Sequence, residues 1–547
     1  MSVNLYEIPI TPVVDLDGDV IVYVPGYAKK GPLEPTLVTA DTFEEIFGDT
    51  PYTFANGDTT SGPANNTLGK NAPDRGWLYA KGLLDAGLTV LYHRIPNDPN
   101  TAFAITDKVV VISSEYTGAA DTAPTTYELA FRARFPGSFY SNYSIAVGAL
   151  QNGVQKISVY QKDDLGEDHL VQERSVSFDP EDPFFIGKEG LLDNIDILFY
   201  YQGARVDNIT EAFGLEDIYH PATGTAGSMR LRTPAETVPS STPIKPTSYA
   251  LSIPATSTSE FTVSSFLTNL ATKLDDLLDT DTYPTVTYIT SGGYYQTTAL
   301  AKKMLETANS IKAIALIDLS ESVSSLKSTI ESIGADTSDY IKGAAFVGGD
   351  TFNIYGSNRI MADSYGYLTK LGKNLSQAIP AWIPVANVPQ GVTTAVATTR
   401  PITFATKAMF IPSDNRGVAI NPIVYKQNSG YTIMGNRTLA KLNGVTGPDA
   451  FLNCQLVVNS VLRSARRAAA DLLIVSTSPT TAFSTFYSAV SKTCEKMLVN
   501  GDGLAAYNII KLKKTKPATI DIQIELTLVE GIETFNIYVP YSIALDA

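Results

Sequence analysis

Residues 451–472 read FLNCQLVVNSVLRSARRAAADL, and residues 520–528 read IDIQIELTL. In the first segment apolar side chains recur at steps of three and four, which is the spacing of one face of a helix. In the second segment Ile and Leu alternate strictly with Asp, Gln, Glu and Thr, which predicts a strand with one buried and one solvated face. The two segments therefore predict a domain in which helices pack against strands.

The neighbouring segments extend this domain over residues 401–547. Apolar residues at helical spacing predict a second helix over 483–497, and the glycines at 501 and 503 are typical of a helix end. A second strand is predicted over 504–511. Ahead of both helices lies a short motif that consists of Gly435, Asn436, Arg437, Thr438 and Leu439.

Extended arms are predicted at both ends of the chain. Pro9 and Pro12 near the start and Pro540 near the end cannot donate a ladder hydrogen bond, which disfavours a central strand at either end. We expect one arm in residues 1–19, where a frayed terminus is the alternative, and a second arm in residues 533–545. Their apolar residues are Val3, Leu5, Tyr6, Ile8 and Ile10 at the start, and Phe535, Ile537, Val539, Tyr541 and Ile543 at the end.

An α/β domain is predicted in two pieces, residues 20–96 and 261–400. In the first piece a buried strand runs into a Gly- and Pro-rich loop, and a helix and a second strand follow. In the second piece helices and strands alternate up to residue 347, and residues 360–400 are expected to hold a short helix and a turn at Trp382. The apolar run at residues 314–317 suits a strand that is buried on both faces of a parallel sheet.

A β-rich outer domain is predicted between these pieces, in residues 97–260. Short runs of β-forming residues are separated by Gly, Asp, Asn and Ser, which is typical of a β-barrel or a β-sandwich. The Ser-, Thr- and Pro-rich stretch at residues 223–259 is expected to be a linker or an exposed loop. The fold class is therefore a multidomain α+β and α/β protein.

Composition narrows the classes of function. The 547 residues carry a net charge of −15, and an acidic chain is a poor candidate for direct nucleic-acid binding. The sequence has no apolar run of the ~18–20 residues that cross a bilayer and no signal-peptide pattern, so we expect a soluble protein made in the cytoplasm. Cys454 and Cys494 lie on apolar helix faces and are expected to be buried free thiols.

The sequence predicts no catalytic, cofactor or metal site. His93, His169 and His220 lie far apart, with no cysteine or acidic partner at metal-binding spacing. Nucleophile-elbow and glycine-rich nucleotide motifs are absent from the sequence. Two weaker candidates have plainer interpretations: residues 291–293 as a loop turn, and Asp318, at a strand end, as a helix N-cap.

Taken in order, these features resemble the sheath proteins of contractile tails, which encase the tail tube of myovirus-type bacteriophages and related injection machines. The resemblance rests on the Gly435–Leu439 motif, the two helices, the paired strands and the extended last segment. The first strand, its Gly–Pro loop and the helix that ends at Phe47 and Gly48 resemble the start of such proteins. The Pro-Gly and aromatic turn in residues 135–147 is similar to a further sheath signature.

The resemblance implies a structural subunit rather than an enzyme. Such a subunit polymerises as stacked hexameric rings around the tail tube and contracts to drive the tube through the host envelope during genome delivery. It implies as partners further copies of the chain, the tail tube protein, and baseplate and tail terminator proteins, with no direct nucleic acid and no membrane insertion. The location it implies is the virion tail, assembled in the bacterial host cytoplasm.

The resemblance also assigns roles to particular residues. It implies that the two arms pair with neighbouring subunits and that a basic helix face of the C-terminal domain contacts an acidic tube. The candidates for the tube contact are Arg463, Arg466, Arg467, Lys492 and Lys496, each of which fits a solvated helix face equally well. Two other functions stay open at this point: a cytoplasmic α/β enzyme with an inserted β-domain, and another tail or baseplate protein.

Overall fold

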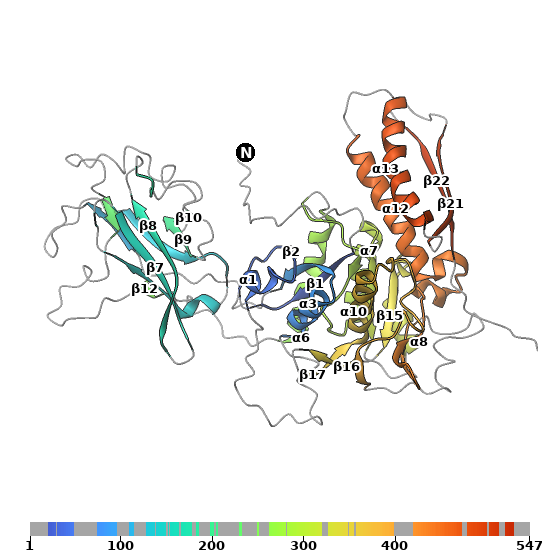
Figure 1. The fold of residues 1–547 in the computed structure, drawn as a ribbon, viewed down its shortest axis with the longest axis horizontal. Helices are drawn as coiled ribbons and strands as arrows, with labels where there is room; N and C mark the ends of the chain where they lie inside the picture. Colours follow the sequence, from blue (N-terminus) through green and yellow to red (C-terminus); the bar gives the residue numbers. More distant parts are fainter. Residues whose placement is uncertain are drawn as a thin grey trace, which may run out of the picture.

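The structure is a computed structural model. It describes residues 20–48, 74–95, 262–398, 420–472, 479–499, 503–512 and 520–529 apart from short gaps, together with parts of residues 109–250. Figure 1 shows a β-rich part at one end, a central α/β part, and a pair of helices with a hairpin at the other end. The two expected arms, residues 1–19 and 533–545, lie outside the described residues.

A six-stranded sheet forms the centre of the molecule. Its strands follow the order β15-β14-β13-β1-β3-β2, and all are parallel except the edge strand β2. They are β1 (Ile21–Gly26), β2 (Thr36–Val38), β3 (Thr89–Arg94), β13 (Tyr288–Ile289), β14 (Ile314–Leu319) and β15 (Gly343–Val347). Strands from before and after the β-rich part therefore join in one sheet.

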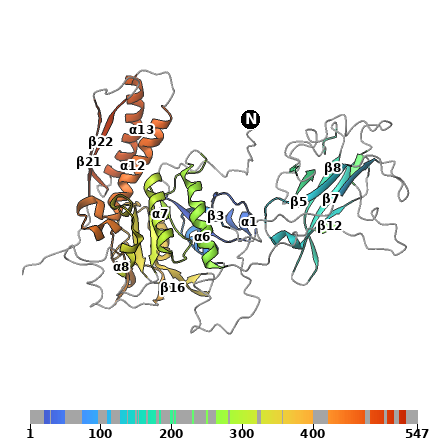
Figure 2. The same cartoon turned by 180° about the vertical axis from the view of Figure 1, so that it is seen from behind.

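Helices cover both faces of this sheet. The first face packs on α3 (Arg75–Asp85) and α10 (Asp363–Ser376), and the second on α6 (Val263–Lys273), α7 (Thr298–Ile311), α8 (Leu326–Ile333) and α9 (Thr337–Tyr340). Figure 2 shows α6 and α7 from the second face. Along β14, Ile314 and Leu316 join the first core, whereas Ala315 and Ile317 join the second, which confirms the expected strand buried on both faces.

The segment after β15 differs from the prediction. Helix α10 is not short but has 14 residues. Two strands before it and one strand after it in the sequence form a small antiparallel sheet. Its strands, in the order β17-β16-β18, are β16 (Gly349–Ile354), β17 (Ser357–Ala362) and β18 (Ala395–Thr398). Gly366 and Gly372 allow this helix to pack closely, because a Cβ there would press on the Phe352 ring and on the Ala86 carbonyl.

The β-rich part contains two open antiparallel sheets. One has the strand order β10-β9-β5-β4-β11 and the other the order β12-β6-β7-β8. The strands are β4 (Val109–Ser113), β5 (Tyr127–Ala133), β6 (Tyr143–Val147), β7 (Val154–Lys162), β8 (Asp168–Ser177), β9 (Ile197–Tyr201), β10 (Ala204–Arg205), β11 (Met229–Leu231) and β12 (Tyr249–Ala250). The strands that the structure describes form no closed barrel, so the barrel alternative is wrong for them.

Arg94, at the end of β3, joins the β-rich part to the central sheet. Its buried guanidinium donates through Nε to Ala28 O (3.0 Å), and through Nη1 to Gly31 O (2.8 Å) and Pro136 O (2.7 Å). Removal from water lowers the pKa of Arg94 to about 10, so the group is still a cation at neutral pH. The joint brings together the Gly–Pro loop and the Pro-Gly turn that the sequence marks as sheath-like.

The last part of the chain confirms the two expected helices and two expected strands. They are α12 (Leu452–Ala470), α13 (Pro479–Val499), β21 (Leu504–Lys511) and β22 (Ile522–Leu528). The short hairpin β19 (Ile423–Lys426) and β20 (Gly430–Ile433) precedes them, followed by 3-10 turns at Leu439–Asn443 and Gly447–Ala450. Across the part of the chain that can be described, we find no helix with the length and apolar content needed to cross a membrane.

Candidate functional site at the C-terminal hairpin

The hairpin of β21 and β22 packs by one face against α12 and α13. The core between them is apolar and includes Val457, Val461, Phe486, Val490, Met497, Leu504 and Ile509. Cys454 and Cys494 are buried free thiols, as expected. The other face of β22 is exposed and polar, with Gln523, Glu525 and Thr527. The hairpin is therefore a single layer of strands on a helical support.

Both edges of this hairpin are open in the described part of the chain, where β21 and β22 pair only with each other. Leu512 N donates to Asp521 O (2.8 Å), so these two residues form a hydrogen-bonded pair. In an antiparallel ladder every second pair is hydrogen-bonded, and the pairs between them direct their main-chain groups away from the partner strand. Ile522, Ile524 and Leu526 therefore direct their N–H and C=O groups outward. A sheet of two strands has marginal stability, and an unpaired strand edge can pair with a further strand.

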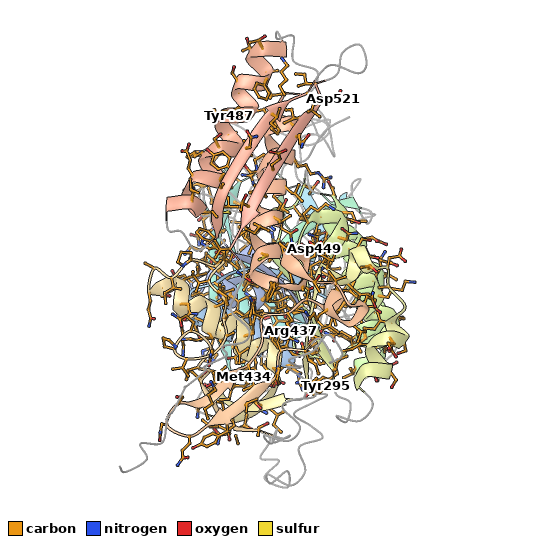
Figure 3. All side chains as sticks on the ribbon, turned by 90° about the vertical axis from the view of Figure 1, so that its right-hand side faces the viewer. Tyr295, Met434, Arg437, Asp449, Tyr487 and Asp521 are labelled. Carbon is orange, nitrogen blue, oxygen red and sulfur yellow. The ribbon has the colours of Figure 1, made fainter. Side chains whose placement is uncertain are left out.

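The Gly435–Leu439 motif attaches this unit to the central sheet. Asn421 N donates to Ala345 O of the edge strand β15 (2.9 Å). The Asn421 side chain accepts from Arg437 N (2.8 Å) and donates to Arg437 O (3.0 Å), as a paired strand would. A Cβ at Gly435 would lie 2.8 Å from Asn421 Oδ1, so this position favours glycine. Figure 3 shows Arg437 below the helices and Tyr487 near their far end.

The same motif supplies the start of α12. Asn436 O accepts from Leu452 N (3.0 Å), and Asn436 Oδ1 accepts from Asn453 N (3.3 Å), so Asn436 satisfies the first N–H groups of the helix. Thr438 Oγ1 donates to Asp449 O (2.6 Å), which closes the turn before the helix. The residues of the motif thus set the direction in which α12 leaves the sheet.

Polar side chains hold the first half of α12 to the sheet. Buried Lys342 donates from Nζ to Gln455 Oε1 (2.8 Å) and Asn459 Oδ1 (2.6 Å), and Asn459 Nδ2 donates to Ala313 O (3.2 Å). Burial lowers the pKa of Lys342 to about 8. These buried groups gave no sequence signal, because Gln455 and Asn459 lie among apolar residues of an ordinary helix pattern.

Arg463 and Arg466, two of the five residues proposed to face a tube, contact the end of α7. Arg463 Nη1 donates to Lys312 O (2.8 Å), and Arg466 Nη1 approaches Ser310 O at 3.5 Å. Both carbonyls belong to the C-terminal end of α7, where the helix dipole favours a cation. Burial lowers the pKa of Arg463 to about 10.

The other three basic residues, Arg467, Lys492 and Lys496, are exposed. Arg467 and Lys492 line a shallow groove of about 630 Å³ between α12 and α13. The rest of its lining is mostly small, with Ser464, Ala468, Ser484, Thr485, Ser488 and Ala489, and it includes one carboxylate, Asp471. A contact of these cations with an acidic partner stays a prediction.

The place where an α/β enzyme binds its ligand is filled by the chain itself. Strand order reverses at β1, between β13 and β3, and ligands of such sheets bind beyond the carboxyl ends of the strands at this reversal. Here a Cβ on Gly76 would lie 2.6 Å from Gly26 Cα, and a Cβ on Gly292 would overlap the Pro25 carbonyl oxygen. The backbones touch directly, which leaves no volume for a phosphate or a substrate at that point.

Asp318, the other candidate of the sequence, is buried beside this contact. It accepts from Ser364 N (3.1 Å) and Ser364 Oγ (2.6 Å), in the first turn of α10, and Ser364 Oγ also contacts Tyr79 OH (2.8 Å). Its carboxylate thus caps a helix, as expected, but a helix distant in sequence. Burial is the main cause that raises the pKa of Asp318 to about 6.

The sequence offers the three histidines no acidic partner at metal-binding spacing, but in the structure two of them lie near a carboxylate. His169 Nε2 lies 2.8 Å from Asp163 Oδ2 on the surface, and buried His93 Nε2 lies 3.8 Å from Asp276 Oδ2. Burial lowers the pKa of His93 to about 4. The carboxylate near His169 lies across a turn, and the carboxylate near His93 lies on another element. A search of the sequence for the residue spacings of known metal motifs therefore does not find these pairs.

Comparison with known proteins found no matching family model and no matching curated sequence. The similar solved structures include a sheath tail protein from Listeria innocua (9% identity, 93% of this chain and 95% of that chain, TM-score 0.47). They also include a sheath tail protein from Desulfitobacterium hafniense (13% identity, 97% and 99%, TM-score 0.44) and the contracted sheath complex PVC of an extracellular contractile injection system (15% identity, 50% and 80%, TM-score 0.38). All three are described as sheath proteins or sheath complexes.

The hydrogen bonds that hold α12 to the sheet predict the effect of Asn459→Ala. The substitution removes two hydrogen bonds and leaves a buried ammonium group with one acceptor fewer, so the free energy of unfolding should fall by about 1–3 kcal/mol. Leu462→Ala, at an exposed position of the same helix, is the control and should cost less. Urea unfolding of both variants measures the difference; equal losses would contradict the role of Asn459.

The close backbone contact at the point where strand order reverses predicts that substitution of Gly292 lowers the free energy of unfolding more than substitution of Gly444, which has a similar φ angle. Gly292 has φ +68° and no room for a Cβ, whereas Gly444 has φ +74° and no atom within 4 Å of one. Gly444→Ala should cost about 1 kcal/mol from the backbone alone, and Gly292→Ala distinctly more. Similar thermal unfolding midpoints for the two variants would show that the reversal has space.

The buried carboxyl of Asp318 predicts a pH dependence. Because its pKa is raised from 3.8 to about 6, its contribution to stability is fully present below pH 3.8 and is lost as pH rises through 6. This difference corresponds to up to about 3 kcal/mol. Asp318→Asn should flatten the decline of the unfolding midpoint between about pH 4 and pH 6, the interval between the two pKa values. A profile unaltered by Asp318→Asn would refute the assignment.

Proposed function

We propose that this protein is the sheath subunit of a contractile injection apparatus. The observation that carries the proposal is the hairpin of β21 and β22, which has outward-directed main-chain groups along both edges and a firm helical support. A strand that adds to such an edge binds mainly through main-chain hydrogen bonds, which depend little on the identity of its side chains. The hairpin therefore suits a joint between copies of one chain.

The arms of neighbouring copies are the strands that we assign to these edges. Residues 2–14 and 533–545 are apolar and proline-interrupted, and the second arm follows β22 after a few residues. An arm donated to the next copy makes a head-to-tail contact, and such contacts generate a helical polymer when they do not close. Main-chain joints persist while the bodies they connect rotate, which suits contraction of stacked hexameric rings.

The exposed cations on α12 and α13 are the surface that we assign to the tube. Arg467 and Lys492 flank the groove, and Lys496 lies one turn further along α13. Arg463 and Arg466 are secondary candidates, because they already contact the end of α7. The enzyme alternative has less support, since the chain fills its own strand reversal. Contraction then drives the tube through the host envelope, with the baseplate and tail terminator as the remaining partners.

Electron microscopy of the purified protein in negative stain tests the joint. Ile524→Pro removes an outward N–H of β22 while sparing the ladder to β21, and Ile524→Ala is its matched control for the lost side chain. We expect long hollow cylinders from the full chain and from Ile524→Ala, and small particles from Ile524→Pro and from a chain without residues 533–547.

Cylinders that form equally well in all four proteins would exclude strand exchange as the joint. Small closed oligomers from the unaltered chain and from all three variants would instead favour the enzyme alternative. Circular dichroism of Ile524→Pro, compared with Ile524→Ala, separates loss of assembly from loss of the hairpin itself.

A further inference from the structure

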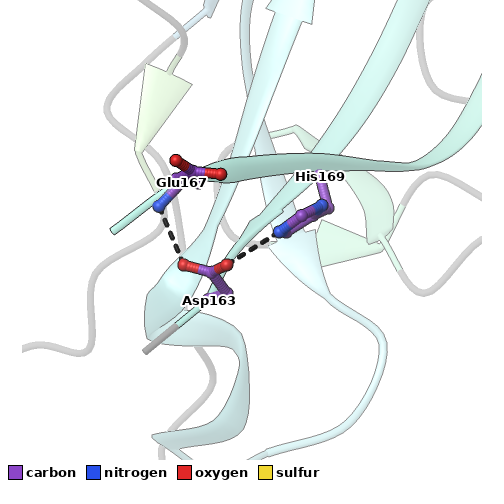
Figure 4. Close-up of side chains that lie close together, drawn as sticks. All are labelled: Asp163, Glu167 and His169. Atoms are coloured by element: carbon purple, nitrogen blue, oxygen red, sulfur yellow. Dashed lines mark hydrogen bonds and ion pairs between the residues drawn. The ribbon is translucent and has the colours of Figure 1, made fainter. Parts of the chain in front are cut away.

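Side chains of three metal-binding types meet at the turn between β7 and β8. They are Asp163, Glu167 and His169, and the ligand atoms they offer all lie within 4.8 Å of one another (Figure 4). The antiparallel register pairs Gln161 with His169, so the imidazole and the Asp163 carboxylate lie on opposite arms of one turn. This cluster is separate from the C-terminal hairpin, and the proposed function leaves it unexplained.

Asp163 is the centre of the cluster. Its Oδ1 accepts from Glu167 N (2.8 Å), and its Oδ2 lies 2.8 Å from His169 Nε2. Main-chain bonds close the same turn: Asp163 N donates to Glu167 O, and Gly166 N donates to Asp163 O, both at 3.0 Å. The backbone that carries the three groups is thus fixed, whereas the side chains of Glu167 and His169 are exposed and free to adjust.

Charge around the turn favours a cation. Residues 162–169 contain four carboxylates, at 163, 164, 167 and 168, and a single lysine, Lys162. The carboxylates of Asp163 and Glu167 lie close enough to repel each other, and one surface pair with a histidine compensates little of that cost. A divalent ion between Asp163 and Glu167 would neutralise both.

We propose that this turn binds one divalent transition-metal ion through His169 Nε2 and one oxygen each from Asp163 and Glu167. An imidazole nitrogen with two carboxylate oxygens suits Zn²⁺, Co²⁺ or Mn²⁺, whereas Ca²⁺ and Mg²⁺ take oxygen ligands. Metal–ligand distances of about 2.0–2.2 Å require the three atoms to draw closer by rotation of exposed side chains. The ion replaces the Asp163–His169 contact, and water takes the positions that remain.

Titration of the full chain with Co²⁺, followed by its visible absorption bands, tests the site. One Co²⁺ per chain is expected, with a band that Zn²⁺ abolishes and excess Ca²⁺ does not. His169→Ala, Asp163→Asn and Glu167→Gln should each weaken Co²⁺ binding at least about tenfold. Glu173→Gln, at an exposed position of the same strand whose partner is Lys156, is the control and should bind as the parent does.

Three outcomes would overturn the proposal: no Co²⁺ bound by the full chain, binding unaffected by His169→Ala, or displacement by Ca²⁺ at concentrations similar to those of Zn²⁺. The last would indicate a site of carboxylates alone. Thermal unfolding of each variant without metal shows that the change in binding is not a loss of fold, since all three side chains lie at the surface or close to it.

Discussion

The attachment of the C-terminal unit depends on the side chain of Asn421. Its amide pairs with both main-chain groups of Arg437, while its own N–H donates to the edge strand β15. One residue thereby links the edge strand of the sheet to the motif that starts α12. Because Lys342 and Arg463 then hold the same helix along its side, the hairpin, the helices and the sheet form one body. An interface built on the hairpin acts directly on the central domain.

Local patterns predicted the C-terminal elements well, because their signals are short-range. Helices α12 and α13 bury one regular face, and β22 alternates strictly, so spacing alone was sufficient. The same spacing could not tell what the residues off the apolar face contact. Arg463 was named from the resemblance as one candidate for a tube contact, and within the chain it donates to the Lys312 carbonyl, 151 residues earlier.

Other features escaped prediction because they arise only when distant segments meet. The contact of Gly26, Gly76 and Gly292 involves three glycines that have ordinary local contexts in the sequence. Helix α10 was expected to be short but has 14 residues, and its glycines pack against Phe352 and Ala86, which lie elsewhere in the sequence. The cluster at His169 lacks the spacing of known metal motifs, and the strand register alone brings its members together. The two arms, in contrast, were inferred from the sequence and lie beyond the described residues.

The joint at Arg94 has a consequence for how such a protein changes over evolution. Its guanidinium binds three main-chain carbonyls, and the β-rich part contributes only one of them, from Pro136. A carbonyl is present whatever side chain a residue carries. Substitutions of side chains on the surface of the β-rich part therefore leave the acceptor of this attachment in place. A designer could therefore replace the strands of the β-rich part while keeping Arg94 and the turn at Pro136 that it binds.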